Sequence, residues 1–186
     1  MRIIHTDQVR DLVEALFRRA ATELPADVVS ALAAGRRLEK GEMGRAILGE
    51  LVENERIARN EGLPVCQDCG LAVLFMEIGQ EACFEGPGLM SAIDEGVRRA
   101  YLGGFLRKSS VTDPLYDRKN TGDNTPAIVH ASPVPGEGVR LVAAPKGMGS
   151  ENASTVTMLR PADGEEGVVR AVLQTVDRLG ANACPP

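Results

Sequence analysis

The sequence predicts an α+β fold in which a helical N-terminal cap precedes a small, mainly antiparallel sheet with flanking helices. Three observations favour this class. Helical apolar spacing dominates residues 1–62, strand-like apolar runs begin only in residues 63–186, and strands and helices do not alternate as regular βαβ units. The chain has 186 residues, a length typical of one domain, and we expect one compact domain over 1–186.

Three helices are expected in the N-terminal region. Thr6 is the expected N-cap of the first, because its hydroxyl can accept a hydrogen bond from a free amide of the first turn. Pro25 begins the second helix, which ends near Gly35, and the third spans about 42–60 and ends at Gly62. The residues that place one apolar face on the first helix are Val9, Leu12, Val13, Leu16, Phe17 and Ala20.

Strands and helices both occur in the second region. Cys83 lies in an apolar segment that is expected to pair back on the preceding strand and to reach the core. A polar, irregular segment at 105–124 is long enough to be functional or disordered. Apolar runs predict strands at 71–78, 127–131, 139–144 and 155–159, and helical spacing predicts helices at 89–102 and 165–179.

Composition argues against several classes of protein. The formal net charge is −5, whereas a nucleic-acid platform is usually basic. No apolar run reaches the roughly 18 residues of a transmembrane helix, and the first residues lack a signal-peptide pattern. We therefore expect a cytoplasmic, reducing location without nucleic acid or membrane. There the four cysteines serve more often as metal ligands, reactive thiols or core residues than as disulfides.

The segment 63–70, Leu-Pro-Val-Cys-Gln-Asp-Cys-Gly, carries the densest chemistry in the chain. It places two thiols, an amide and a carboxylate on a turn that leads into an apolar strand. A redox C-x-x-C prefers the start of a helix, where the helix dipole lowers a thiol pKa. A zinc site needs a second close pair, which Cys83 and Cys184 do not form. Spacing favours one structural and one functional thiol.

Three further features could bind a ligand, and each has an ordinary alternative. The segment 146–152 is glycine-bearing and follows a strand, so its amides could bind a carboxylate or phosphate, or it could be a plain turn. Arg107 could bind a carboxylate through two parallel hydrogen bonds, although a loop arginine is most often only solvated. Cys184 precedes two prolines and is either a presented thiol or part of a frayed tail.

Taken together, these features resemble the α subunit of the class I, iron–sulfur-dependent fumarases, a family shared with L(+)-tartrate dehydratases. The motifs occur in the order and at about the spacing of that family. They are Cys66-Gln67-Asp68, Leu106-Arg107-x-Ser109, Asn120-Thr121-x-Asp123-Asn124-x-Pro126-Ala127, Lys146-Gly147-x-Gly149-Ser150-x-Asn152 and Ala183-Cys184-Pro185-Pro186.

The resemblance implies a site for a 4Fe–4S cluster with one iron open to substrate. Cys66 and Cys184 would each bind an iron, and the third cysteine ligand is expected outside this chain segment. Substrate would contact Gln67, Asp68, Arg107 and the backbone at Gly149, with Asp68 close to the proton transfer. The family usually has threonine at position 69, and Cys69 is interpreted as a substitution, not as a ligand.

The implied activity is a hydro-lyase that converts fumarate to malate, with L(+)-tartrate dehydration as the alternative. A β subunit or further domain is expected to complete the active site, and a homo-oligomer of αβ units would suit the family. We therefore expect the 186 residues alone to be an incomplete enzyme. A redox or zinc-binding C-x-x-C module and a purely structural assembly domain are the competing hypotheses from other classes.

Overall fold

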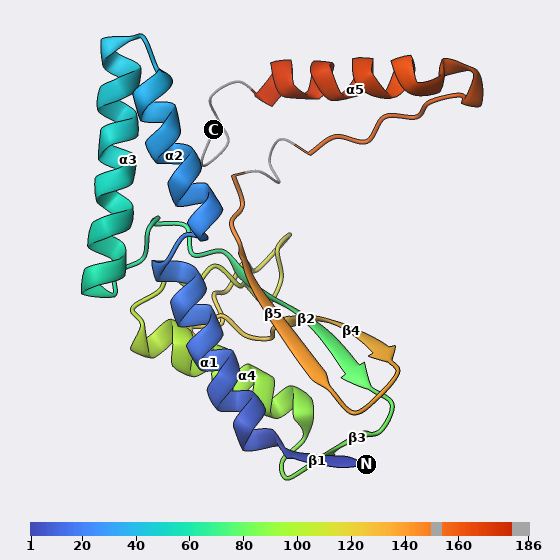
Figure 1. Cartoon of the computed structure of the whole chain (residues 1–186). Helices are drawn as coiled ribbons and strands as arrows, with labels where there is room; N and C mark the ends of the chain where they lie inside the picture. Colours follow the sequence, from blue (N-terminus) through green and yellow to red (C-terminus); the bar gives the residue numbers. More distant parts are fainter. Residues whose placement is uncertain (150–153, 180–186) are drawn as a thin grey trace. The chain divides into compact units, whose positions relative to one another are not determined.

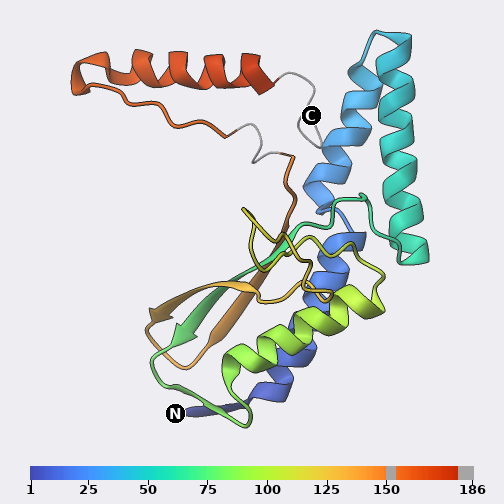
Figure 2. The same ribbon diagram turned by 180° about the vertical axis from the view of Figure 1, so that it is seen from behind.

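Residues 1–149 and 154–179 are described by the structure, a computed structural model that confirms the predicted α+β class. The chain divides into two compact units, Met1–Lys146 and Gly147–Pro186. The helices and strands of each unit are drawn in Figures 1 and 2. No helix in the described part of the chain is long and apolar enough to cross a lipid bilayer.

A three-stranded sheet lies at the centre of the first unit. Strand β2 (Leu71–Gly79) is the middle strand, between β4 (Ile128–Val134) and β5 (Val139–Lys146). It runs parallel to β4 and antiparallel to β5, which makes this small sheet mixed. These three strands agree with three of the predicted apolar runs.

Two helices cover one face of this sheet. Helix α1 (Thr6–Thr22) and helix α4 (Leu89–Gly103) both begin and end close to the predicted positions. Alternate residues of β2 point toward them, because side chains of a strand alternate between its two faces. The core comprises Val13, Phe17, Ala72, Leu74, Met76, Ile93, Val97, Ala100 and Tyr101, all of them almost fully buried.

Helices α1 and α4 pack against each other at Gly96. A Cβ atom at this position would come within 2.5 Å of the carbonyl oxygen of Arg10 and 2.9 Å of the Val13 Cβ. Only a residue without a side chain fits such a close approach. Further along the same contact, the rings of Phe17 and Tyr101 lie 6.3 Å apart between centroids in a tilted arrangement. The packing at this crossing therefore fixes the position of Tyr101 on α4.

Helices α2 (Ala26–Leu38) and α3 (Glu42–Glu61) were both predicted, although α2 continues past Gly35, and they form a helical hairpin. Figure 1 shows the two helices side by side, and Gly62 ends α3 in a left-handed conformation with φ of 67°. Apolar side chains such as Met43 and Ile47 remain exposed along α3. A hairpin of two helices has too little partner surface to bury every apolar position.

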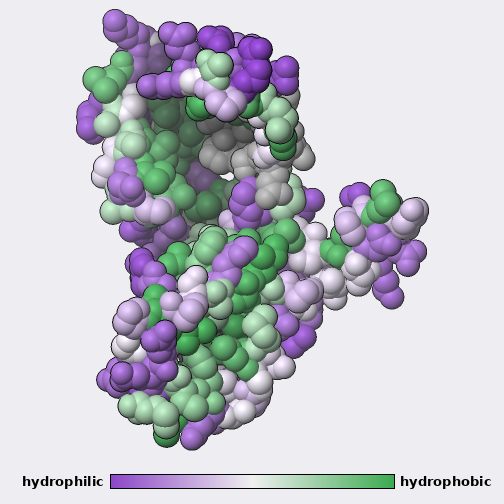
Figure 3. All heavy atoms as spheres, turned by 90° about the vertical axis from the view of Figure 1, so that its right-hand side faces the viewer, coloured by the Kyte–Doolittle hydropathy of each residue, from purple (hydrophilic) through white to green (hydrophobic). Residues whose placement is uncertain are grey.

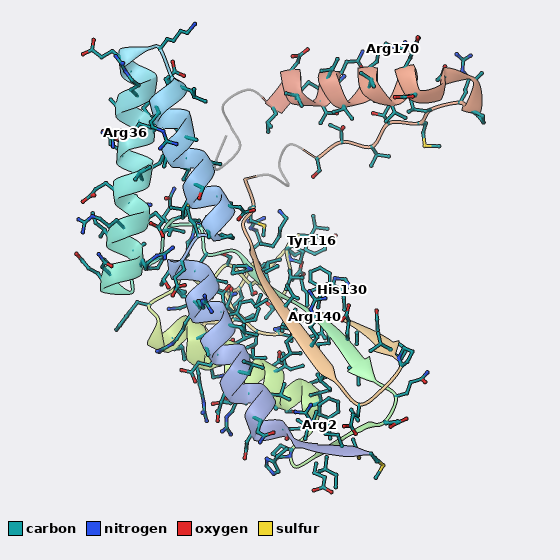
Figure 4. All side chains as sticks on the ribbon, viewed as in Figure 1. Arg2, Arg36, Tyr116, His130, Arg140 and Arg170 are labelled. Atoms are coloured by element: carbon teal, nitrogen blue, oxygen red, sulfur yellow. The ribbon has the colours of Figure 1, made fainter. Side chains whose placement is uncertain are left out.

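The opposite face of the sheet carries a partly apolar surface. Phe75 and His130 stack with ring centroids 5.0 Å apart, and Arg140 forms an ion pair with Glu77 across the strands. Figure 3 shows hydrophobic surface on the sheet-bearing part of the first unit, and Figure 4 shows His130 and Arg140 on the two outer strands. Val142 contributes further exposed apolar area.

Several local predictions were wrong. Thr6 is not the N-cap of α1. His5 takes that role through its side chain, while the Thr6 hydroxyl donates to the Pro87 carbonyl oxygen. A short strand, β1 (Arg2–His5), was missed, and it pairs in parallel with β3 (Ala82–Glu85). Cys83 is exposed, because this two-stranded ribbon leaves one face of β3 in solvent.

The second unit consists of an extended segment, a 3-10 turn and a helix. The predicted strand at 155–159 is wrong, because these residues have no strand partner in the described part of the chain. They lie along α5 (Gly164–Leu179), where the hydroxyls of Thr155 and Thr175 are 2.9 Å apart. The turn η2 (Pro161–Asp163) joins the two.

Candidate functional site

The site begins with the segment 63–70, here called the thiol loop, which connects α3 to β2. Its start is fixed by a backbone group of helix α1 and a side chain of helix α3. The Val65 amide donates to the Ala21 carbonyl oxygen at 3.0 Å, and the Asn54 side-chain amide donates to the Val65 carbonyl oxygen at 2.7 Å. At the other end Gly70 has φ of 65°, a conformation that glycine adopts without strain. The loop is therefore fixed at both ends.

Within the thiol loop, Cys66, Gln67 and Asp68 form local contacts. The Asp68 amide donates to Cys66 Sγ at 3.4 Å, and the Cys66 thiol lies 3.6 Å from Gln67 Oε1. The Asp68 carboxylate accepts from the Gly70 amide at 3.2 Å, which is a side-chain turn typical of aspartate. Cys66 and Asp68 are half-buried, whereas Gln67 is exposed. The three side chains thus lie together at the edge of solvent.

Cys69 has a different environment from Cys66. Its side chain is buried, it donates to the Cys66 carbonyl oxygen at 3.8 Å, and it accepts from the Arg107 amide at 3.2 Å. Burial raises the pKa of the Cys69 thiol. A reactive dithiol needs a lowered thiol pKa and access to solvent. The redox interpretation of Cys66 and Cys69 therefore lacks support from the local environment.

The second segment, residues 105–110, is called the arginine loop. Leu106 is buried and its amide donates to the Tyr101 carbonyl oxygen at 3.0 Å, which ties the loop to the end of α4. Arg107 follows, with its amide bound to Cys69 and its guanidinium exposed. That guanidinium has no ion-pair partner among residues 1–149 and 154–179. It remains available for an anionic ligand.

The third segment, residues 120–126, is called the amide loop, and it contains the most buried polar side chain of the site. Asn124 has no exposed area, and its Oδ1 accepts from the amides of Ser109 and Ser110 at 2.7 and 3.0 Å. Its Nδ2 donates to the Gly70 carbonyl oxygen at 3.1 Å. Asn124 therefore bonds to both the arginine loop and the thiol loop.

Tyr101 completes this network from helix α4. Its hydroxyl lies 3.0 Å from the carbonyl oxygen of Cys69 and 3.2 Å from that of Gly70, and it is fully buried. Sequence reasoning quoted Asn124 only as part of a motif and gave neither Asn124 nor Tyr101 a role. Helical spacing could place Tyr101 on the inner face of α4, but it carries no information about which backbone atoms the hydroxyl meets.

Part of the polar segment 105–124 stays on the surface. Val111 and Asn120 form an isolated antiparallel bridge, and residues 112–119 between them form a surface excursion. Tyr116 lies within it, 82% exposed, and is marked in Figure 4. Asp113 holds this part through its carboxylate, which accepts from the amides of Leu115 and Tyr116. The segment is irregular, as predicted, and its two ends form the arginine and amide loops.

The structure therefore brings together four of the six predicted site residues in the first unit, Cys66, Gln67, Asp68 and Arg107. Gly149 lies in the second unit, half-buried in a turn. Cys184 lies outside the described residues. No group of three or more His, Cys, Asp or Glu side chains within 1–149 and 154–179 is arranged to hold a metal ion.

Comparison with known proteins gives consistent matches over most of the chain. The sequence model of the family described as Fumarate hydratase (Fumerase) matches residues 10–186. A protein of Methanocaldococcus jannaschii named "Putative L(+)-tartrate dehydratase subunit alpha" is 36% identical over 184 residues, which cover 96% of this chain and 64% of the relative.

More distant relatives carry similar names. L(+)-tartrate dehydratase subunit alpha of Escherichia coli O157:H7 is 28% identical over 182 residues, covering 97% of this chain and 60% of the relative. The protein of the same name from Shigella sonnei matches with the same identity and coverage. The chain thus spans 60–64% of the length of these curated relatives.

Proposed function

The chain belongs to the fumarate hydratase (Fumerase) family, and from that premise we propose that it forms part of a hydro-lyase that reversibly hydrates fumarate to malate. The observation that carries the proposal is the hydrogen bond from the Arg107 amide to Cys69 Sγ. It joins the arginine loop to the loop of Gln67 and Asp68, so an exposed cation, an exposed amide and a half-buried carboxylate lie on two bonded loops. That combination suits a dicarboxylate substrate.

Arg107 is the proposed carboxylate-binding group. A guanidinium presents parallel N–H donors that match the two oxygens of a carboxylate, and the guanidinium of Arg107 is exposed. Gln67, also exposed, would add an amide donor to the same or the second carboxylate. The amide of Gly149 would contribute a backbone N–H, since small residues let an anion approach the backbone.

Asp68 is the proposed acid–base residue. Hydration adds a proton to one alkene carbon of fumarate and a hydroxyl group to the other, and the reverse reaction removes both as water. A carboxylate can hold or accept the proton at carbon when it lies within hydrogen-bond reach. The bond from the Gly70 amide orients the Asp68 carboxylate, which is half-buried. A fixed carboxylate next to the bound substrate meets that requirement.

Cys66 and Cys184 are the proposed cysteine ligands of a 4Fe–4S cluster, with the third ligand from outside this sequence. The environment of Cys66 fits a ligand, because its sulfur is half-buried and accepts an amide hydrogen bond from Asp68 at 3.4 Å. Such bonds to cysteine sulfur are one means by which proteins tune iron–sulfur clusters. The cluster would supply a Lewis-acidic iron that holds and polarises the oxygen groups of the substrate.

L(+)-tartrate dehydration is the second candidate reaction, and the names of the relatives favour it. This reaction removes a proton from one carbon of tartrate and a hydroxyl group from its neighbour, and the resulting enol becomes oxaloacetate. Both substrates carry two carboxylates on a four-carbon chain. Arg107, Gln67 and Asp68 would serve both, so the roles proposed here do not depend on which substrate is used.

A partner is also part of the proposal. The matched relatives are named as alpha subunits and are longer than this chain. We therefore propose that the remainder of the subunit and a β subunit or additional domain complete the active site. An oligomer of αβ units would then be the working enzyme.

The test is anaerobic cluster reconstitution of the complete subunit with its partner, followed by assays with fumarate, malate and L(+)-tartrate. Conversion of one of these dicarboxylates, dependent on the cluster, is the expected result. The 186-residue chain serves as the comparison and should neither retain a stoichiometric cluster nor turn over substrate. A reconstituted assembly that dehydrates or hydrates none of the three compounds would overturn the proposed function.

A further inference from the structure

We propose that Asn124 is a positioning residue that fixes the arginine loop against the thiol loop and so sets the separation of Arg107 and Asp68. This inference rests on the proposed function, which assigns those two residues to substrate. Asn124 itself is fully buried and does not reach the solvent-facing surface. Its action is through the backbones of the two loops that carry the substrate-facing groups.

The two ends of the Asn124 amide have separate tasks. Oδ1 accepts from the Ser109 and Ser110 amides at 2.7 and 3.0 Å, which holds the backbone two and three residues after Arg107. Nδ2 donates to the Gly70 carbonyl oxygen at 3.1 Å, two residues after Asp68. One planar group therefore spans the gap between the loops, and its rigid length defines their spacing.

Two further bonds close the same junction. The Tyr101 hydroxyl lies within hydrogen-bond distance of the Cys69 and Gly70 carbonyl oxygens, and the Arg107 amide donates to Cys69 Sγ. These polar groups are all buried or partly buried. The loss of a hydrogen-bond partner by a buried polar group lowers the stability of the fold. The junction is therefore expected to open as a unit when Asn124 is lost.

Asparagine suits this position for a conformational reason as well. The backbone of Asn124 has φ of 65°, in the left-handed region that asparagine, aspartate and glycine adopt more readily than other residues. Aspartate and glycine can thus replace it without adding backbone strain. Asn124→Asp keeps an acceptor for Ser109 and Ser110 but removes the donor to Gly70, whereas Asn124→Gly removes all three bonds.

The consequence for chemistry follows from the shape of the substrate. A four-carbon dicarboxylate has a short reach, and its reacting carbon meets Asp68 only if the carboxylate bound by Arg107 is at the correct distance. A displacement of about 1 Å in a positioned group can reduce the rate about 100-fold. Asn124 is therefore expected to influence both the KM for dicarboxylate and kcat, although it makes no contact with substrate.

The experiment compares Asn124→Gly, Asn124→Asp and Tyr101→Phe in the assembled enzyme, by residue-resolved hydrogen exchange and by steady-state kinetics. In Asn124→Gly we expect the Arg107, Ser109 and Ser110 amides to exchange at least about tenfold faster while α1 and α4 amides are unchanged. In Asn124→Asp only the Arg107 amide should accelerate. The kcat/KM values should fall about 100-fold for glycine and less for aspartate, a partial rescue by the conservative variant.

Thr121→Val is the matched control from the same loop. The Thr121 Oγ1 atom is buried and has no hydrogen-bond partner among the described residues, so this variant should leave loop exchange and kinetics unchanged. Tyr101→Phe keeps the ring contact with Phe17 and is expected to fold, which provides a second variant if those at Asn124 do not.

Two results would overturn the inference. One is unchanged exchange at Arg107, Ser109 and Ser110 in Asn124→Gly and at Arg107 in Tyr101→Phe. The other is faster exchange throughout α1 and α4 in the same variants, which would indicate loss of general stability only. The exchange measurement needs no turnover. If the wild-type assembly lacks hydro-lyase activity but the Asn124 variants show the expected exchange pattern, the proposed function is refuted and the inference about the loop junction stands.

Discussion

The Arg107 amide nitrogen lies 3.2 Å from the sulfur of Cys69, although the two residues are 38 positions apart in the chain. This bond links the loop before β2 to the loop after α4, and it adds to the bonds that Asn124 makes to both loops. It also gives Cys69 a structural role, which agrees with its interpretation as a substitution and not a ligand. An oxygen in place of the sulfur could accept the same hydrogen bond.

Substitution of Cys69 tests this link. Cys69→Thr supplies a hydroxyl that can accept from the Arg107 amide, and we expect activity within about threefold of wild type, since the bond is preserved. Cys69→Val has a similar size but no acceptor, and should be less stable by about 1–3 kcal/mol, the cost of an unpaired buried donor. Urea unfolding and steady-state kinetics measure both effects. An inactive Cys69→Thr would instead support a thiol-dependent redox or zinc function.

Asp68→Asn tests the proposed proton transfer. The amide keeps the shape of the side chain but cannot accept a proton, so kcat should fall about 100-fold to 10,000-fold with a small change in KM. The matched control is Asp117→Asn, because Asp117 is exposed on the surface excursion of the polar segment. Equal kcat values for the Asp68 variant and the control would contradict the role of Asp68 and favour a purely structural domain.

Arg107→Lys tests bidentate carboxylate binding. Lysine retains the charge but lacks the planar pair of donors, and we expect KM for the dicarboxylate to rise about tenfold, equivalent to about 1.4 kcal/mol. Arg140→Lys is the control, since Arg140 lies on the far face of the sheet with an exposed ion pair to Glu77. An unchanged KM in Arg107→Lys would argue that the guanidinium does not bind substrate.

Asp123 gives the amide loop a dependence on pH. Burial acts to raise the pKa of this carboxyl, but hydrogen bonds from Thr125 and the guanidinium of Arg98 outweigh it and hold the pKa below its usual 3.8. A lowered folded-state pKa means that the ionised carboxylate stabilises the fold above the unfolded pKa, and that this contribution is lost as the pH falls through the folded value.

The corresponding variant is Asp123→Asn. At neutral pH we expect it to lower the free energy of unfolding by about 1–2 kcal/mol, because bonds to a charged group are replaced by weaker neutral ones. The difference from wild type should begin to shrink below about pH 4, where the carboxyl of the unfolded chain takes up protons, and should be lost as the pH falls through the lower pKa of the folded state. Urea titrations of both proteins across this range provide the measurement, and a constant difference would contradict the pKa assignment.

Much of the fold could be predicted because its elements bury apolar residues at regular spacing. Val13 and Phe17 lie on the inner face of α1, and Leu74 and Met76 on the inner face of β2, as periodicity requires. Errors occurred where the local sequence pattern does not determine burial or strand pairing. Cys83 is in an apolar stretch, yet the short β1–β3 ribbon leaves it exposed. Residues 155–159 have strand composition but lie along a helix.

The contacts between the loops of the candidate site could not be predicted, for a different reason. Motif resemblance proposes Cys66, Asp68 and Arg107 as site residues, and hydrogen bonds tie the loops that carry them together through Cys69. Asn124 bonds to both loops, and its partners are backbone atoms. Gly70 lies 54 positions from Asn124 in the sequence, and Ser109 lies 15 positions from it. Backbone partners leave no trace in side-chain composition, so no sequence pattern could assign this role.

Gly96 extends this argument beyond the site itself. The absence of a side chain at Gly96 determines how closely α4 approaches α1. Tyr101, about one and a half turns later on α4, reaches the loop junction. The packing of two helices therefore influences the position of the loops that carry the proposed substrate-binding residues. Small residues at that crossing are therefore expected to shift the proposed substrate-facing groups without any change in those side chains.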